Sequence, residues 1–200
     1  PPITVISQVY GSGGISGTEY KQVFIEIFNR SSADVAIGGW SVQYASSAGS
    51  TWQVSTIPAN TVLKAGQYYL IRQAAGNGGT RDVPMDAEGK LALSGTAGKV
   101  ALASNSVALS GTMPNSAALV DLVGFGNSAG YESAPTPPLS NTRSASRNAG
   151  GCDDSDSNLL DFTVGAVAPR YSASPLQACH LGPIAAPIIA SCPATLLRPH

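Results

Sequence analysis

Residues 23–30 read VFIEIFNR, and this stretch decides the fold class. In an extended strand Phe24, Glu26 and Phe28 share one face, and the odd-numbered residues 23, 25 and 27 share the other. The stretch is rich in the β-branched and aromatic residues that favour strands. It therefore predicts a β-strand.

Similar short runs occur on both sides of this stretch. They lie at residues 3–10, 35–37, 40–44, 52–54, 61–63, 68–72, 90–93, 99–103 and 118–123. Clusters of Gly, Pro, Asn or Ser separate them at intervals typical of sandwiches and barrels, and no window has a capped helical stripe. Residues 127–147 lack clear periodicity, and their prolines indicate an extended segment rather than a paired strand. The sequence predicts an all-β protein.

Composition narrows the class of partner. The chain has 200 residues, enough for one sandwich with a core, and 43% of them are hydrophobic against 12% charged. Its formal net charge is −1 and its Lys and Arg residues are scattered singly, so the basic patch of a duplex-DNA binder is missing. No run reaches the ~18 apolar residues of a membrane span. The first residues have no signal-peptide pattern, so an exported protein would be represented by its mature form or a piece.

Three cysteines, Cys152, Cys179 and Cys192, lie in the last quarter of the sequence. None forms a CxxC pair, and a zinc site would have to recruit His180 or His200. We favour a disulfide between Cys152 and Cys179, with Cys192 free or paired elsewhere. Closing a loop of that length contributes roughly 3–4 kcal/mol in the chain-entropy picture.

Oxygen-bearing side chains crowd the segment from residue 152 to residue 162. They are Asp153, Asp154, Asp156, Asn158 and Asp161. Calcium takes about six to eight oxygen ligands, and an Asp-x-Asp-x-Asn run can present several of them from one side. The run lacks the glycine and the final acidic residue of an EF-hand loop. Two interpretations stay open, a calcium site or a solvated turn whose side chains cap backbone amides.

Catalytic patterns are weak in this sequence. Ser-His-Asp chemistry needs a histidine base, and the two histidines, His180 and His200, both lie in the terminal region. Glu26 and Asp121 are the best carboxylate pair for a glycosidase, but no sequence feature brings them together. The glycine-rich residues 11–14 lack the Lys-Ser/Thr of a phosphate loop. We expect a protein that is not an enzyme.

The order of several motifs points to a family. They are ISQVY at 6–10, FIEIFN at 24–29, GWSVQY at 39–44, KAGQYYLI at 64–71, GKVAL at 98–102 and VDLVGFG at 120–126. Together they resemble the lamin tail domain in its bacterial, exported form, over roughly residues 3–147. Residues 151–179 are similar to the tail that accompanies bacterial members.

The resemblance implies an immunoglobulin-like β-sandwich without catalytic activity. We expect this sandwich at residues 1–170 and an irregular, disulfide-tied C-terminal extension or linker at residues 171–200. The large aromatic residues are expected mainly in the core; they are Trp40, Tyr44, Trp52, Tyr68 and Tyr69. Exposed tyrosines, with Tyr44, Tyr69 and Tyr131 as candidates, would instead offer contacts for sugars or another chain.

Bacterial relatives in this family are usually attached to extracellular nucleases, phosphoesterases or other surface proteins. The expected function is therefore adhesion or assembly of an exported protein, at the cell surface or after secretion. Expected partners are other protein chains or copies of itself, through edge strands and the apolar residues 184–190, or surface polysaccharide or extracellular DNA. Calcium is the one cofactor considered. The alternative is the N-terminal accessory domain of a secreted nuclease or phosphoesterase whose catalytic domain is absent from this chain.

Overall fold

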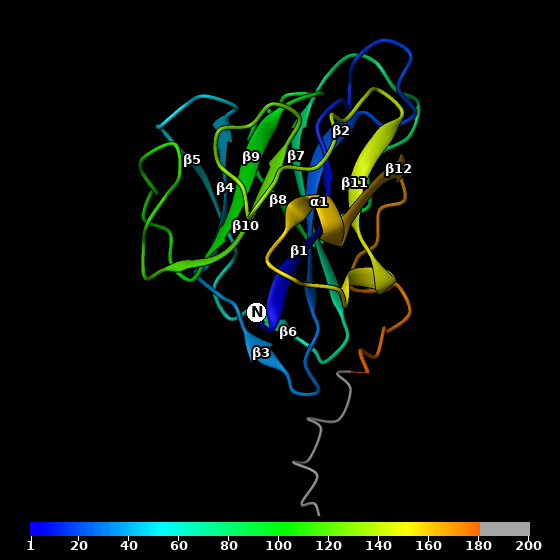
Figure 1. Cartoon of the computed structure of the whole chain (residues 1–200). Coiled ribbons are helices and arrows are strands. Elements are labelled where there is room, and N and C mark those ends of the chain that lie inside the picture. Colours follow the sequence, from blue (N-terminus) through cyan, green and yellow to red (C-terminus); the bar gives the residue numbers. More distant parts are fainter. Residues whose placement is uncertain (181–200) are drawn as a thin grey trace, which may run out of the picture.

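Two β-sheets face each other in the computed structural model of this chain, which describes residues 1–180 (Figure 1). Residues 181–200, which include the apolar residues 184–190 expected to contact partners, Cys192 and His200, lie outside the described residues. Within residues 1–180, no helix is long and apolar enough to cross a membrane.

The larger sheet has six strands in the order β12-β11-β1-β2-β7-β8. Their bounds are β1 Thr4–Tyr10, β2 Gln22–Asn29, β7 Tyr68–Ala75, β8 Ala87–Glu88, β11 Arg143–Arg147 and β12 Phe162–Ala166. Neighbouring strands run antiparallel except β7 and β8, which are parallel. The N-terminal strand β1 therefore pairs with β2 on one side and with the late strand β11 on the other.

The smaller sheet has four antiparallel strands in the order β10-β9-β4-β5. Their bounds are β4 Ser41–Ser46, β5 Gln53–Thr56, β9 Gly98–Ala103 and β10 Leu119–Phe125. Two short strands, β3 Val35–Ala36 and β6 Val62–Leu63, pair separately. A 3-10 turn at Ala149–Gly151 and the short helix α1, Asn158–Asp161, interrupt the chain between β11 and β12. This arrangement confirms the all-β, immunoglobulin-like sandwich.

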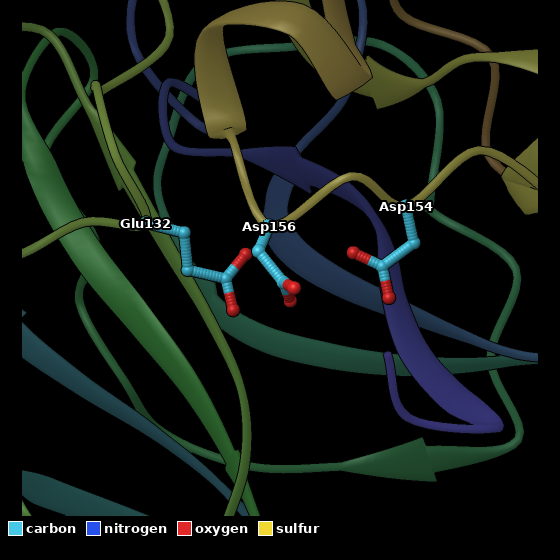
Figure 2. A group of neighbouring side chains, drawn as sticks. All are labelled: Glu132, Asp154 and Asp156. Atoms are coloured by element: carbon cyan, nitrogen blue, oxygen red, sulfur yellow. The ribbon is translucent and has the colours of Figure 1, made fainter.

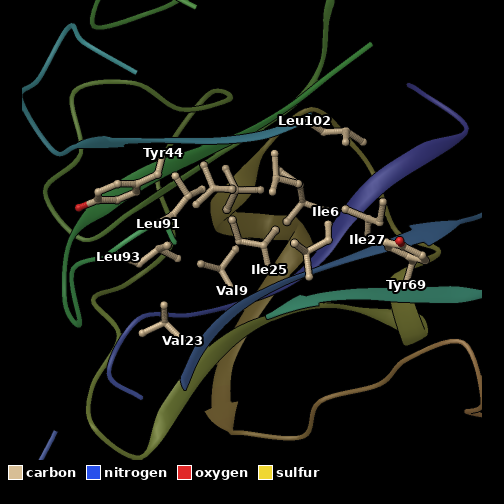
Figure 3. Packing of buried hydrophobic residues seen from close by; sticks show 14 of the residues in the cluster. Ile6, Val9, Val23, Ile25, Ile27, Tyr44, Tyr69, Leu91, Leu93 and Leu102 are labelled. Carbon is tan, nitrogen blue, oxygen red and sulfur yellow. The ribbon is translucent and has the colours of Figure 1, made fainter. Parts of the chain in front are cut away.

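The main core lies between the sheets, where apolar residues of both inner faces meet (Figure 3). Val23, Ile25 and Ile27 of β2, which share one face as their alternation predicts, point into it. They meet Val42 of β4 and Leu102 of β9 in the same cluster. The inner face of β2 is thus an ordinary sandwich face.

The outer face of β2 is buried as well, because the segment after β12 covers it. Phe24 packs in a cluster with Val167 and Tyr171, and Phe28 packs in another with both disulfide cysteines. The predicted disulfide between Cys152 and Cys179 is confirmed, with a Cα–Cα distance of 5.4 Å. Residues 167–179 therefore form a lid on the larger sheet.

Two local predictions were wrong. Residues 90–93 form no strand, because Leu91 makes only single contacts, with its N–H on Gln73 Oε1 and its C=O on the N–H of Ala74. Part of the supposedly unpaired segment 127–147 is strand β11, whose polar sequence RSASR is held between β1 and β12. Tertiary pairing overrides the weak local pattern there.

The predicted aromatic core is largely confirmed. Trp52, Tyr44, Tyr68 and Tyr69 are all buried, and Trp40 packs half-buried against the main cluster. Tyr44 and Tyr69 are each only 8% exposed, so the idea that they form a sugar or protein platform is wrong. Both rings face the inter-sheet core (Figure 3).

Removing the disulfide tests how strongly the lid is tied to the sheet. The free energy of unfolding of the double variant Cys152→Ser/Cys179→Ser is expected to be lower by roughly 3 kcal/mol. Without the cross-link the unfolded chain gains conformational entropy, because the loop between the two positions is no longer closed. Chemical denaturation of the oxidised protein and the variant measures this difference. A reducing agent should destabilise the parent and leave the variant unchanged, and equal stability of the two proteins would contradict the assignment.

Candidate functional site

Arg147, the last residue of β11, is the centre of the most highly charged part of the fold. Its side chain is completely buried. The guanidinium donates from Nε to the C=O of Ile6 at 2.8 Å and from Nη2 to Asp121 Oδ2 at 2.7 Å. Its Nη1 donates to the C=O of Asp153 at 3.1 Å and to Asp154 Oδ1 at 3.2 Å. One cation thereby joins β1, β10, β11 and the acidic segment.

Three carboxylates gather beside this guanidinium. Glu132, Asp154 and Asp156 each place an oxygen within 4.8 Å of the others (Figure 2). Glu132 comes from the loop between β10 and β11, whereas Asp154 and Asp156 come from the segment before α1. We call these three residues the carboxylate cluster.

The two aspartates of the carboxylate cluster differ in their freedom. Asp154 faces two guanidinium ions, with Oδ1 on Arg147 and Oδ2 at 3.0 Å from Arg30 Nη1. Asp156 is exposed and has a backbone φ of 56°, a left-handed conformation that Asp tolerates better than most residues. Its C=O accepts a hydrogen bond from the hydroxyl of Ser133. Asp156 thus stands at the solvent side of the cluster.

The other predicted calcium ligands have different roles. Asp161 accepts hydrogen bonds from the N–H and hydroxyl of Ser155 and from the N–H of Ser157. These are contacts of the cap-and-turn kind. Asp153 is exposed, and only its C=O contacts Arg147. Neither Asp153 nor Asp161 joins the carboxylate cluster.

Asn158 serves the edge of the smaller sheet. Its Oδ1 accepts from the N–H groups of Gly124 and Glu132 at 2.9 and 3.0 Å, and its Nδ2 donates to the C=O of Leu122 at 2.9 Å. The amide thus occupies the place of a neighbouring strand along β10. All of its strong hydrogen-bonding positions are taken by protein groups, so it is not available as a metal ligand.

Negative charge exceeds positive charge around Arg147, and this shifts the ionisation of Glu132. Burial raises the pKa of Glu132 to about 8, and repulsion from Asp121, Asp154 and Asp156 adds to the increase despite the attraction of Arg147. Burial also raises the pKa of Asp154. The cluster is therefore built to hold a proton at neutral pH, or a cation in its place.

A hard cation fits this cluster only in part. Carboxylate oxygens are the ligands that Ca²⁺ prefers. Glu132 and Asp156 could hold it, but Asp154 already has both oxygens on guanidinium groups. Most of the six to eight or so ligands would then have to be water. The donor set is right in kind and small in number.

Glu26 and Asp121, the carboxylate pair considered for a glycosidase, each bind a different arginine. Glu26 is fully buried and accepts from Arg170, Ser7 and Gln8. Burial raises the pKa of Glu26, although the guanidinium of Arg170 at 2.7 Å opposes the change. Asp121, 1% exposed, accepts from Arg147 and from the N–H of Ile6. Both carboxylates are occupied by internal partners.

Sequence reasoning missed Glu132, the buried Arg147 and the half-buried Arg170. Glu132 is the sole carboxylate between Asp121 and Asp153 in the sequence, an acidic residue isolated in a loop rich in Ser and Pro. That isolation was the one available signal. Nothing local to Arg147 or Arg170 distinguishes them from surface arginines.

Glu132→Gln tests the proton in the carboxylate cluster. Because the folded-state pKa lies above the unfolded value, the proton stabilises the fold fully below about pH 4.5, and this contribution is lost as pH rises through about 8. The melting temperature of the parent should therefore fall more between pH 6 and pH 9 than that of the variant. Identical pH profiles of the two proteins would contradict the assignment.

The same pair of proteins tests the cation. Calcium that binds ionised Glu132 should raise the melting temperature of the parent more at pH 8 than at pH 5, and should affect Glu132→Gln less. Asp153→Asn, at an exposed aspartate outside the cluster, is the matched control and should respond like the parent. A melting temperature that ignores both calcium and chelator would exclude the calcium site and leave the proton.

Known proteins place the fold within a family. No curated protein matches the chain. The Lamin Tail Domain family matches residues 4–127, more than half of the 200 residues. The matched region runs from β1 through β10 and stops before Glu132 and β11. This chain belongs to the lamin tail domain family.

Proposed function

We propose that this chain is a non-catalytic binding or structural module that mediates adhesion or assembly of an exported protein. Membership of the lamin tail domain family supports a module of immunoglobulin-like type. The buried carboxylates support the absence of catalysis, since Glu26 and Asp121 are engaged by Arg170 and Arg147. A general acid or base needs instead to reach a substrate.

Export, in a bacterial cell-surface or secreted setting, is part of the same proposal. The Cys152–Cys179 disulfide closes the C-terminal extension onto the larger sheet. Structural disulfides form and persist mainly in oxidising compartments. The low charge of the chain, 12% of its residues, is compatible with a neutral adhesive surface.

The edge strand β12 is the observation that carries the proposal of assembly. It is the outermost strand at one edge of the larger sheet (Figure 1), and the two-residue strand β8 forms the other edge. Its sequence FTVGA has neither a charge nor a proline. Natural edge strands are usually protected by lysines, prolines, bulges or a covering segment. An edge without these features favours pairing with another strand.

The β10 edge of the smaller sheet differs from the β12 edge, and this difference supports assembly through β12. Along β10, the side chain of Asn158 accepts a hydrogen bond from the N–H of Gly124 and donates one to the C=O of Leu122. The N–H of Thr136 donates to the C=O of Gly124. Within residues 1–180, the fold thus protects the edge at β10 with its own groups and shows no such cover over β12. We infer that β12 pairs antiparallel with β12 of a second copy, in a two-fold arrangement.

Gly165→Lys tests assembly through β12. A Cβ at Gly165 has open space around it, so the folded chain should accept lysine, while its charge should prevent strand addition. Size-exclusion chromatography with light scattering should show a dimer or larger assembly for the parent and a monomer for the variant. Ser106→Lys adds the same charge in an exposed loop of the smaller sheet and should assemble like the parent.

A monomeric parent at high micromolar concentration would contradict the assembly proposal. The accessory domain of a secreted nuclease or phosphoesterase would then be the better account. Assembly that persists in Gly165→Lys would place the contact elsewhere and overturn the role of β12.

A further inference from the structure

A hollow of about 600 Å³ lies on the outer face of the larger sheet, and none of the three residues of the carboxylate cluster lines it. Gln8 of β1 and Ser146 of β11 form its floor. Tyr20, Arg81 and Pro84 line one wall, and the start of the C-terminal lid, residues 167–170, lines the other. These segments are far apart in the sequence and meet only in the folded chain.

A second hollow of about 120 Å³ extends the first. The two share Glu19, Tyr20 and Val167, and the second continues to Asn141 and Thr142 at the turn before β11. We call the two together the lid groove. Its combined size suits a ligand larger than a single small ion, within the several hundred Å³ of ordinary ligand sites.

The charges in the lid groove cancel. Arg81 pairs with Glu19, with both side chains more than half exposed, and Arg170 pairs with the buried Glu26 at 2.7 Å. A polyanion such as DNA is bound through unpaired Lys and Arg residues that release its counterions. The groove offers no such excess, so its electrostatics favour a neutral ligand.

The lining combines planar polar groups with apolar walls. Tyr20 and Ser146, which each carry a hydroxyl group, are among the residues that line the groove. The exposed guanidinium of Arg81 lies over the Tyr20 ring at 5.4 Å from its centre, beside Glu19. Pro84, Val167 and Pro169 supply half-buried apolar surface. Such a lining can bind hydroxyl groups and C–H faces of one ligand at the same time.

We propose that the lid groove binds a short neutral oligosaccharide. Two neighbouring hydroxyls of a sugar can donate to the carboxylate of Glu19 and accept from the guanidinium of Arg81. The C–H faces of the sugar can pack against the proline and valine side chains of the walls. The inference rests on the proposed adhesive function, for which it names the partner. The groove needs the closed lid, because Arg170 and residues 167–169 form one wall.

The probe is an array of neutral oligosaccharides, with cello-, malto-, galacto- and N-acetylchito-tetraoses, beside heparin and single-stranded DNA. The oxidised full chain should retain at least one neutral tetraose and prefer it to both polyanions. Titration calorimetry with that tetraose then compares the variants Ser146→Ala and Tyr20→Phe, which delete one hydroxyl each. Each should weaken binding about five- to tenfold, as expected for one lost hydrogen bond.

A matched control makes the result specific. Ser106→Ala deletes the same hydroxyl group outside the lid groove and should leave the affinity unchanged. Retention of no neutral tetraose, a preference for heparin or DNA, or unchanged affinity in both groove variants would overturn the inference. Light scattering on the same samples separates it from the proposed assembly, because a chain that self-associates without binding sugar refutes the groove alone.

Discussion

The buried guanidinium of Arg147 is the interaction on which the rest of the structure depends. Its donors reach β1 through Ile6, β10 through Asp121, and the acidic segment through Asp153 and Asp154. Burial alone works to lower the pKa of Arg147, but the neighbouring carboxylates outweigh it and raise the pKa, so the group stays charged. A charge without solvent must have its partners in place, and this requirement fixes the loop before α1 against both sheets.

The same logic recurs on the outer face of the larger sheet. Glu26 and Asp121 lie within the region that matches the lamin tail domain family, and their arginine partners, Arg170 and Arg147, lie beyond it. Residues after 127 therefore neutralise charges that are buried within residues 4–127. In doing so they bring Asp154 and Asp156 to Glu132 and build one wall of the lid groove. The candidate sites are consequences of how residues 128–180 pack against the sandwich.

The strands that alternate clearly could be predicted from sequence, because an alternating pattern depends on neighbours along the chain. The run VFIEIFNR gives β2 and the division of its residues between two faces. Strands β11 and β12 could not be found, because RSASR and FTVGA are short and are held by long-range pairing. The acidic run at residues 153–161 could be recognised from sequence as a source of oxygen ligands, but the hydrogen-bond partners of its side chains could not be predicted. Which aspartate meets a guanidinium, and which caps a turn, depends on Arg30 and Arg147 far away in sequence.

The most direct measurement is a double-mutant cycle on Arg147 and Asp121, with Arg147→Met, Asp121→Asn and the double variant compared by urea denaturation. If the buried pair joins the sheets, each single change should lower the free energy of unfolding by about 3–5 kcal/mol. The double variant should then lose less than the sum, with a coupling of roughly 1–3 kcal/mol. Strictly additive losses, or single losses below about 1 kcal/mol, would contradict the central role of Arg147.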